Sequence, residues 1–325
     1  MAANSEAAEQ IQNKWQNGAS AFELETSGST GFPKKIELLR NQLEASARIT
    51  GAFLQIQPDD SIYCCLPVDK IGGMMQIIRA AVWGIPVEIA EPTSNPLKEY
   101  SGNHSVTSLT PMQLRMILDN PESKNKLEKF RLVLVGGGPV SATLEQELTL
   151  IPCTFYHTYG MTETCSHIAM RRIGKEKVFL PLPEIQLRKN EKDCLEISGE
   201  ITNHEWITTN DIVVFENEGF RILGRMDSVI NSGGIKILAE ILEKDISDYL
   251  HLPENSILAV GVPDTILGER LVLLVDSTKI HTPLQTDFTF LKNKFHIPKE
   301  VMYLKHFLFT ETGKIAREKT RLSAL

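Results

Sequence analysis

The residues of this sequence most suited to chemistry form a run of small hydroxylated side chains and glycines that ends near a lysine. Glycines let the backbone approach a polyphosphate closely, hydroxyl and N–H groups donate hydrogen bonds to its oxygens, and a lysine adds positive charge. The run therefore predicts a phosphate-binding loop, with a flexible surface turn as the alternative. No Gly-x4-Gly-Lys-Ser/Thr pattern is present, so this is not a Walker A loop. The residues concerned are Thr26, Ser27, Gly28, Ser29, Thr30, Gly31 and Lys34.

The residues on either side of this run alternate between apolar and polar types. Phe22 and Leu24 precede it, and Ile36 and Leu38 follow it. Alternation with a period of two is typical of half-buried strands. We therefore expect a strand on each side of the loop, whereas the glycine-rich turn of a dinucleotide-binding fold would lead into a helix.

A second segment, residues 159–163, combines three useful chemical groups. The ring of Tyr159 could stack on a nucleobase, the hydroxyl of Thr162 could bind a phosphate, and the carboxylate of Glu163 could hold Mg²⁺. The alternative is a strand-to-loop corner that carries a glutamate by chance. Together with the phosphate loop, the segment favours a site for a magnesium nucleotide.

The elements that must position these groups follow from the apolar pattern. Short apolar strands alternate with helical segments: Thr110 and Pro111 open one helix, Ser141 caps another, and Gly84 closes a third. Such alternation predicts an α/β fold with a largely parallel sheet. Strands are expected at 61–66, 86–90, 105–109 and 131–135, and helices at 72–83, 111–118 and 142–148.

From about Cys194 the segments are short and mostly β, and a second α/β unit follows. The boundary is expected near Met226 and Asp227. This predicts a large N-terminal α/β domain, residues 1–226, and a small C-terminal α+β domain, residues 227–325. In the latter, helices are expected at 239–250 and 291–295, and strands at 256–262 and 271–275.

The composition narrows the classes of function. The chain has 325 residues and a net charge of −7, which argues against general nucleic-acid or membrane-surface binding and favours small-molecule chemistry. The first 18 residues are polar, which predicts no signal peptide, and the best apolar segment, 74–82, is too short for a membrane span and contains Arg79. Five cysteines without CxxC or zinc spacing predict inert thiols in a reducing cytoplasm.

These two motifs and five others, in order along the chain, resemble those of the adenylate-forming superfamily of acyl-CoA synthetases, nonribosomal adenylation domains and luciferases. The resemblance extends from Glu25 to the C-terminus and departs from the family at Lys35 and Asn210, which stand where glycine is common. Asn210 tolerates a left-handed backbone, so we expect the turn to persist. Few residues precede the loop, so the large domain is expected to be N-terminally shortened. The further motifs are 136–139, 209–211, 224–227, 230–234 and 312–317.

The resemblance implies a role for each matching residue. Lys314, Thr162 and Glu163 are implied as catalytic, with Glu163 also holding Mg²⁺. Asp227 is implied as the hinge of a mobile C-terminal domain, and Gly233 and Gly234 as the path of coenzyme A. The implied ATP-binding residues are Thr26, Ser27, Gly28, Ser29, Thr30, Gly31, Lys34, Gly137, Gly138, Tyr159, Asp211 and Arg225.

The implied reaction has two steps and uses ATP, Mg²⁺ and coenzyme A. A carboxylic acid first attacks the α-phosphate of ATP to give an acyl-adenylate and pyrophosphate, and a thiol then converts the adenylate into a thioester. Two alternatives stay open: an enzyme that loads a carrier protein in place of coenzyme A, and a catalytically silent nucleotide-binding protein. Pairing of two copies as a homodimer is one way to complete the shortened domain.

The residues expected to line the acyl pocket are Lys70, His157, Gly160 and Met161. Lys70 stands where the family has a histidine, and a cation in an otherwise apolar pocket suits an acid with a second carboxylate. A surface lysine in a loop is the alternative. The local sequence at 110–118 and 159–167 is most similar to the branch of the family that activates o-succinylbenzoate, an aromatic dicarboxylate of menaquinone biosynthesis.

Overall fold

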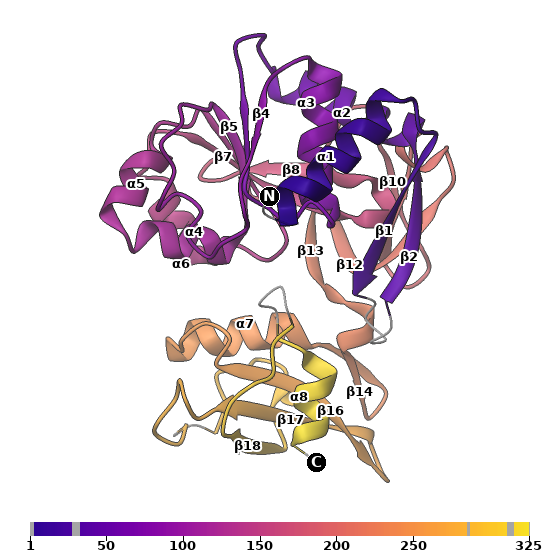
Figure 1. Cartoon of the computed structure of the whole chain (residues 1–325). Helices are drawn as coiled ribbons and strands as arrows, with labels where there is room; N and C mark the ends of the chain where they lie inside the picture. The colour runs from indigo at the N-terminus through magenta and orange to yellow at the C-terminus, as the bar shows by residue number, and fades with distance from the viewer. Residues whose placement is uncertain (1–2, 28–32, 285–286, 311–314, 325) are drawn as a thin grey trace. The chain divides into compact units, whose positions relative to one another are not determined.

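The largest sheet is built from the short apolar strands that the sequence predicts. The structure, a computed structural model, describes residues 3–27, 33–284, 287–310 and 315–324. This sheet has seven strands in the order β4-β3-β5-β6-β7-β8-β9, parallel from β4 to β7 and antiparallel beyond (Figure 1). The expected mixed α/β fold with a largely parallel sheet is confirmed. The strands are β3 (Ile62–Cys64), β4 (Val87–Ile89), β5 (Val106–Leu109), β6 (Leu132–Val135), β7 (Thr154–Met161), β8 (Ser166–Arg172) and β9 (Leu180–Pro181).

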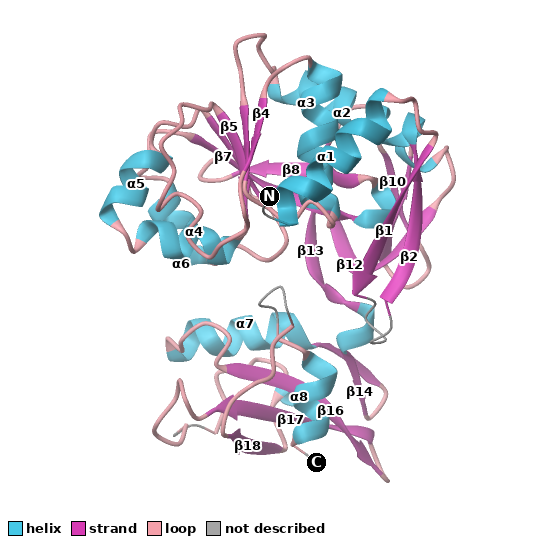
Figure 2. Ribbon diagram, in the orientation of Figure 1, coloured by secondary structure: helices cyan, strands magenta, loops and turns pink. Residues whose placement is uncertain are grey.

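Helices cover both faces of this sheet. Figures 1 and 2 show α4, α5 and α6 together on one side and α1, α2 and α3 on the other. Successive side chains of a strand point to opposite faces, so Val133 and Val135 of β6 share one buried core with Leu114 and Leu144 of the first group. The helices are α1 (Ala3–Gln16), α2 (Arg40–Leu54), α3 (Ile71–Trp83), α4 (Pro111–Leu118), α5 (Pro121–Leu127) and α6 (Ala142–Leu148).

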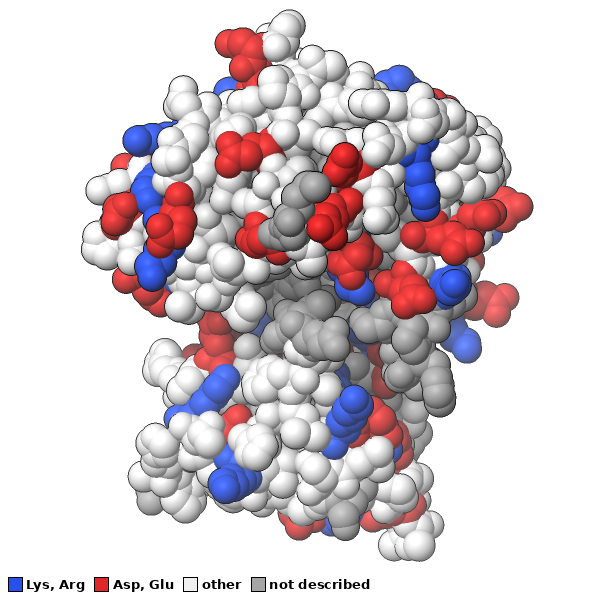
Figure 3. All heavy atoms as spheres, in the orientation of Figure 1, with Lys and Arg blue, Asp and Glu red and all other residues white. Residues whose placement is uncertain are grey.

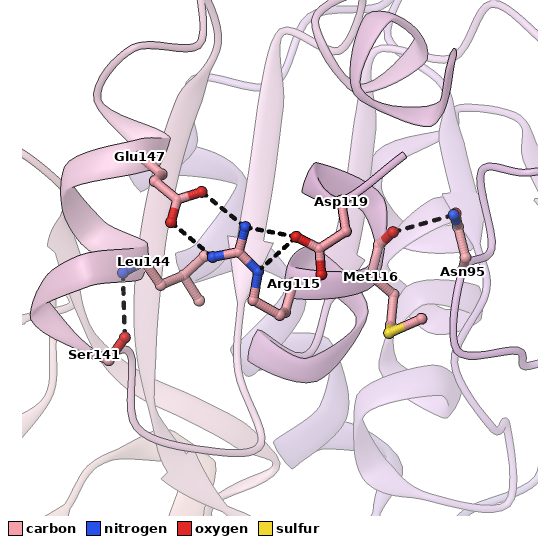
Figure 4. A network of polar contacts seen from close by, with 7 residues as sticks. All are labelled: Asn95, Arg115, Met116, Asp119, Ser141, Leu144 and Glu147. Carbon is pink, nitrogen blue, oxygen red and sulfur yellow. Dashed lines mark hydrogen bonds and ion pairs between the residues drawn. The ribbon is translucent and has the colours of Figure 1, made fainter. Parts of the chain in front are cut away.

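A polar contact ties α4 to α6 on the outer surface. The guanidinium of Arg115 donates two hydrogen bonds to Glu147, of 2.7 and 2.8 Å, and also pairs with Asp119 one turn along its own helix (Figure 4). A bidentate arginine–carboxylate pair fixes direction as well as distance. The two helices are therefore held in register beside the sheet.

The strands expected on either side of the phosphate loop form an antiparallel hairpin. β1 (Ala21–Ser27) pairs with β2 (Pro33–Leu39), from Ala21 opposite Leu39 to Ser27 opposite Pro33. The alternating apolar residues of both strands are buried against α1, α2 and α3. The prediction of two strands is confirmed, and the residues between them, 28–32, lie outside the described chain.

A four-stranded sheet, in the order β10-β11-β12-β13, follows the seven-stranded one along the chain. Residue contacts divide the chain into two compact units, the first made of residues 1–188, 196–208 and 215–220 and the second of 189–195, 209–214 and 221–325. Segments of this sheet therefore belong to each unit, and a boundary at residues 226–227 stays a prediction. The strands are β10 (Gln186–Lys189), β11 (Cys194–Ser198), β12 (Ile207–Glu216) and β13 (Gly219–Arg225).

The second unit contains a five-stranded sheet in the order β15-β14-β17-β16, with β18 paired in parallel to β17. Leu242 and Ile246 of α7 pack on one face of the sheet, and Phe307 packs on the other face against Leu258 and Val260 of β16. The predicted helix at 239–250 is confirmed. The elements are β14 (Val229–Ser232), β15 (Ile235–Leu238), α7 (Ala239–Leu250), β16 (Ile257–Asp264), β17 (Gly268–Asp276), β18 (Glu300–Leu304) and α8 (Arg317–Ser323).

Two local expectations are wrong. The helix expected at 291–295 is only a short 3-10 turn, Lys294–His296, because the Asn293 side chain accepts the Phe295 N–H and Pro298 disfavours helical backbone at the residue before it. The left-handed turn expected at Asn210 is also absent: this residue lies in the extended backbone of β12. The asparagine that replaces the family's glycine at this position therefore does not have to adopt a left-handed backbone.

Acidic and basic side chains are interspersed over the face of the molecule drawn in Figure 3, in keeping with the modest net charge of −7. Among the described residues, none of the helices has the length and apolar character needed to cross a bilayer.

Candidate active site

The segment Tyr159–Glu163 lies at the end of β7, where the strand leads into a 3-10 turn, η1 (Thr162–Thr164). The register of β7 against β8 shifts between Tyr159 and Gly160, and a Cβ on Gly160 would lie 2.1 Å from the Ser166 carbonyl oxygen. Only glycine allows this approach of the two strands. Glycine is therefore required here for backbone packing, whatever else it does.

Buried hydrogen bonds fix the turn itself. The Thr164 hydroxyl is fully buried, accepts the Met161 N–H at 3.1 Å and donates to the Ser166 carbonyl at 2.8 Å. The Ser46 hydroxyl of α2 donates to the Cys165 carbonyl at 2.8 Å. These contacts hold Thr162 and Glu163 partly exposed on a rigid turn, as groups that bind a ligand must be.

Aromatic rings set the position of Tyr159. Its ring centroid lies 5.3 Å from that of Phe220, edge to face, and 5.8 Å from that of Phe179. Phe179 and Phe220 also form a backbone bridge and stack at 5.8 Å. Such packing restricts the tyrosine ring to one orientation.

The glycine turn that follows β6 is linked to this segment through His157. Gly137 has a positive φ of 82°, and the His157 Nε2 lies 3.2 Å from the Gly138 carbonyl oxygen. Burial, aided by the charge of Arg171, lowers the pKa of His157 to about 4, so the imidazole is neutral near pH 7. With Nε2–H donating to Gly138, the buried Nδ1 is an acceptor without a partner among the described residues.

A buried cation that sequence reasoning did not assign lies directly behind the turn. Arg79 of α3 is 2% exposed, and its Nη2 lies 3.3 Å from the Ser166 hydroxyl and 3.3 Å from the His167 ring. His167 Nε2 in turn lies 2.9 Å from the Thr50 hydroxyl. Burial lowers the pKa of Arg79 to about 9, and burial together with the Arg79 charge lowers the pKa of His167.

No carboxylate of the described chain forms an ion pair with Arg79, and its Nε lacks a hydrogen-bond partner there. An unpaired buried charge is costly, so a negatively charged group beside this guanidinium would stabilise it. The signal in the sequence is a single arginine within the apolar segment 74–82.

Lys70, by contrast, is not a buried cation. It precedes the first residue of α3, its ammonium lies 3.5 Å from a carboxylate oxygen of Asp69, and its side chain is 53% exposed. The expected place of Lys70 in the acyl pocket stays a prediction. The argument that a cation in apolar surroundings suits a second carboxylate of the acid applies instead to Arg79, nine residues further along.

Three of the predicted nucleotide and hinge residues lie together in the second unit. Arg225 donates two hydrogen bonds to Asp227, at 3.1 and 2.9 Å, and its Nη1 lies 3.3 Å from Asp211. The bonds to Asp227 raise the pKa of Arg225, and the Thr209 hydroxyl accepts the Asp211 N–H. One guanidinium thus connects the carboxylate expected to bind ribose with the expected hinge.

Gly233 and Gly234 form the two-residue loop between β14 and β15, with φ values of 57° and 79°. Hairpins with such loops require positive φ at both positions, and glycine meets this requirement without strain. The pair therefore has a structural reason independent of the predicted coenzyme A path.

Several predicted residues lie outside what the structure describes. These are Gly28, Ser29, Thr30, Gly31 and Lys314; for Thr26, Ser27 and Lys34 only the backbone pairing in the hairpin is described. In the first unit the described candidate residues belong to β7, η1 and α3, and in the second unit to β12 and β13.

Glu163 is suited to Mg²⁺ in a particular way. No cluster of three or more His, Cys, Asp or Glu side chains that could hold a metal exists within the described residues. Mg²⁺ commonly takes one or two carboxylates and completes its six ligands with water and substrate phosphates. One half-buried carboxylate on a rigid turn fits that mode of binding.

Comparison with known proteins gives a consistent result. The family model described as AMP-binding enzyme matches residues 2–199. The 2-succinylbenzoate–CoA ligase of Listeria monocytogenes is 26% identical over 343 residues, which cover 96% of this chain and 72% of that protein.

Solved structures agree. The acyl-CoA synthetase (AMP-forming)/AMP-acid ligase II-like protein of Dyadobacter fermentans is 33% identical, with a TM-score of 0.67, over 99% of this chain and 95% of that one. The o-succinylbenzoate coenzyme A synthetase of Bacillus subtilis, solved with ATP and magnesium, is 21% identical with a TM-score of 0.73, over 92% and 69% of the two chains. At 21% identity, the likeness to the Bacillus subtilis structure shows the fold alone.

Proposed function

Since the chain belongs to the AMP-binding family of adenylate-forming enzymes, we propose that it is an ATP-dependent acid–thiol ligase that converts a dicarboxylic acid into its coenzyme A thioester. The observation that carries the proposal is the setting of the segment Tyr159–Glu163. Through His157 it adjoins the glycine turn at Gly138, and through Ser166 it adjoins the buried guanidinium of Arg79. A nucleotide and an anionic acid would therefore meet at one rigid turn.

In the first half-reaction the acid carboxylate attacks the α-phosphate of ATP and pyrophosphate leaves. We assign the nucleobase to the face of Tyr159 and the ribose hydroxyls to Asp211, with Arg225 beside it. Thr162 donates to a phosphate, and Glu163 would hold Mg²⁺, which neutralises phosphate charge when bound. Because attacking and attacked groups are both anionic, catalysis consists mainly of positioning and charge neutralisation.

The family motif at 312–317 assigns the remaining positive charge at the reacting atoms to Lys314. In the second half-reaction the thiol of coenzyme A attacks the acyl carbonyl and AMP leaves. We propose that the C-terminal domain turns about Asp227 between the two steps, so that Lys314 serves only the first. Phosphate contacts in the first step come from the loop at 26–34.

The assignment of the acid rests on Arg79, whose charge has no carboxylate partner among the described residues. A carboxylate beside this guanidinium would turn a costly buried cation into an ion pair, and the neighbouring Ser166 hydroxyl and neutral His167 could add hydrogen bonds. The carboxylate that attacks the α-phosphate cannot also pair with Arg79, so the proposed substrate carries two carboxylates. The activity named for the Listeria relative makes o-succinylbenzoate the first acid to test.

A panel of carboxylic acids with ATP, Mg²⁺ and coenzyme A, followed by AMP release, tests the proposal. It includes o-succinylbenzoate and benzoate, and it compares the wild type with Arg79→Met and the matched surface variant Lys70→Met. We expect Arg79→Met to raise KM for the dicarboxylate roughly 10- to 100-fold, the loss of one buried charge-assisted contact, with little effect on a monocarboxylate.

Lys70→Met is expected to change KM less, because an exposed charge near Asp69 contributes little. Absence of AMP release with every acid contradicts the ligase assignment. An equal loss on both classes of acid in Arg79→Met contradicts the dicarboxylate assignment. Transfer of the acyl group to a carrier protein in place of coenzyme A contradicts only the assignment of coenzyme A as the acceptor.

A further inference from the structure

Glu243 and Arg317, to neither of which the motifs assigned a role, form a partly buried ion pair in the second unit. Arg317 Nη2 lies 2.6 Å from Glu243 Oε1, and Nη1 lies 3.0 Å from Oε2. The side chains are 26% and 16% exposed. Burial raises the pKa of Glu243, and the hydrogen bonds from Arg317 oppose this change.

The pair also clamps the backbone of one strand. The Ala259 N–H donates to Glu243 Oε1 at 2.7 Å, and the Ala259 carbonyl accepts from Arg317 Nη2 at 3.0 Å. Ala259 lies in β16, which among the described strands pairs with β17 alone and so forms an edge of the sheet. The clamp therefore joins α7, the edge of the sheet and the start of α8 at one point.

Arg317 lies three positions after Lys314 in the sequence. Ile315 forms an antiparallel bridge with Phe309, and the Ala316 N–H donates to the Leu308 carbonyl at 2.8 Å. The fully buried Thr320 accepts the Leu308 N–H at 3.1 Å. Residues 308–309 and 315–316 are thus held to one another next to the clamp.

Stability alone does not account for such a pair. Replacing a buried ion pair by well-packed apolar side chains is often neutral or stabilising, since desolvation offsets the attraction. What a bidentate arginine–carboxylate pair supplies is direction, because its two parallel hydrogen bonds fix both planes. Fixed direction matters most where a backbone must present one side chain accurately.

We propose that Glu243 and Arg317 are positioning residues of the adenylation half-reaction. Glu243 orients Arg317, and Arg317 anchors the backbone that follows Lys314 to β16. Neither touches the reacting atoms. The inference rests on the proposed role of Lys314 in the first half-reaction, and it assigns to the pair an effect on that half-reaction and not on the second.

The test separates the two half-reactions in the full-length protein. ATP–pyrophosphate exchange is measured with o-succinylbenzoate, or with whichever acid of the panel releases most AMP, and thioester formation is measured from the synthetic adenylate of that acid and coenzyme A. The variants are Arg317→Lys, Glu243→Gln, Lys314→Ala and the double variant of Arg317→Lys with Lys314→Ala. Arg321→Lys is the matched control, because Arg321 lies on the same helix, is equally exposed at 26%, and contacts Glu318 and the Gly261 carbonyl of β16 but not Glu243.

We expect Arg317→Lys and Glu243→Gln to lower exchange roughly 10- to 100-fold, the effect of a small displacement of a catalytic group, and to leave thioester formation within about twofold. Arg321→Lys should leave both unchanged. Adding Arg317→Lys to Lys314→Ala should cause no further loss, because the pair acts through that lysine.

The proposal is overturned if Arg317→Lys leaves exchange unchanged, or if it lowers both half-reactions and the melting temperature together. It is also overturned if the fold-loss of exchange in the double variant equals the product of the fold-losses in the two single variants. Failure of the underlying function looks different. If Lys314→Ala retains normal exchange, or the wild type shows none with any acid, then the proposed function is wrong whatever Arg317→Lys does.

Discussion

His157 shows how the surroundings of one residue decide what it can do. Its imidazole is held between the Gly138 carbonyl and the ring of Phe179, whose centroid lies 5.0 Å away, and burial lowers its pKa to about 4. In the unfolded chain a histidine has a pKa near 6.5. Between these values the unfolded state binds a proton that the folded state does not bind, so stability falls as the pH falls through this window.

We predict that the free energy of unfolding of the wild type decreases by about 2 kcal/mol between pH 7.5 and pH 5 on account of His157. His157→Gln should remove that part of the decrease, which is measured as the change in urea midpoint between the two pH values. The pKa of His167 is also lowered, so this residue reduces stability at low pH in the wild type and in His157→Gln alike. The difference between the pH responses of the two proteins therefore reports on His157. His281→Gln, at an exposed position, should retain the full decrease. An identical pH response in His157→Gln and wild type would contradict the prediction.

At the scale of elements, α4, α5 and α6 of the first unit begin where short polar side chains meet unpaired N–H groups. The Thr110 hydroxyl accepts the Gln113 N–H at the start of α4, and the Ser141 hydroxyl accepts the Leu144 N–H at 3.1 Å at the start of α6 (Figure 4). The first N–H groups of a helix have no partner within it, so each cap supplies one. α6 follows the glycine turn at 136–138, and its start therefore also delimits that turn.

We predict that Ser141→Ala destabilises the protein by about 1 kcal/mol, the usual value of a lost helix cap. The change should lower the melting temperature by roughly 2–4 °C, measured by circular dichroism. Ser141→Asp, which can accept the same hydrogen bond, should restore the wild-type value. If Ser141→Ala and Ser141→Asp have the same melting temperature, the cap does not contribute to the stability of the protein.

At the scale of the whole molecule, the proposed reaction requires the chain near Asp227 to adopt two backbone conformations. Asp227 lies in a short 3-10 turn, η3 (Met226–Ser228), and its carboxylate is bound by Arg225. Proline fixes φ near −65°, so it permits one conformation of this residue and excludes others. Alanine removes the ion pair and leaves the backbone free.

We therefore predict that Asp227→Pro lowers overall coenzyme A ligation by roughly 10-fold or more while one half-reaction stays within a few-fold of the wild type, because only one domain arrangement remains accessible. Asp227→Ala should slow ligation less. The measurements are pyrophosphate exchange, thioester formation from the synthetic adenylate, and the complete reaction. Equal losses in all three assays for Asp227→Pro would mean that this residue is no hinge.

The sequence by itself determined the local elements and the family. Thr110 and Ser141 at the starts of helices, Gly84 with a φ of 69° at the end of α3, and the alternating residues beside the phosphate loop all act through neighbours along the chain. Such signals are short-range, and they can be read without the fold. The ordered motifs then identify the superfamily, which the matching family model bears out.

Only the tertiary structure decided which charges are buried and what they face. Lys70 and Arg79 belong to one stretch of sequence, yet one is exposed beside Asp69 and the other is enclosed behind β8 without an anionic partner among the described residues. Glu243 and Arg317 are distant in sequence and meet only because α7 and α8 pack against the same strand. Burial and pairing depend on contacts between remote segments, so the assignment of a second carboxylate to Arg79 and the proposed positioning pair could be argued only from the folded chain.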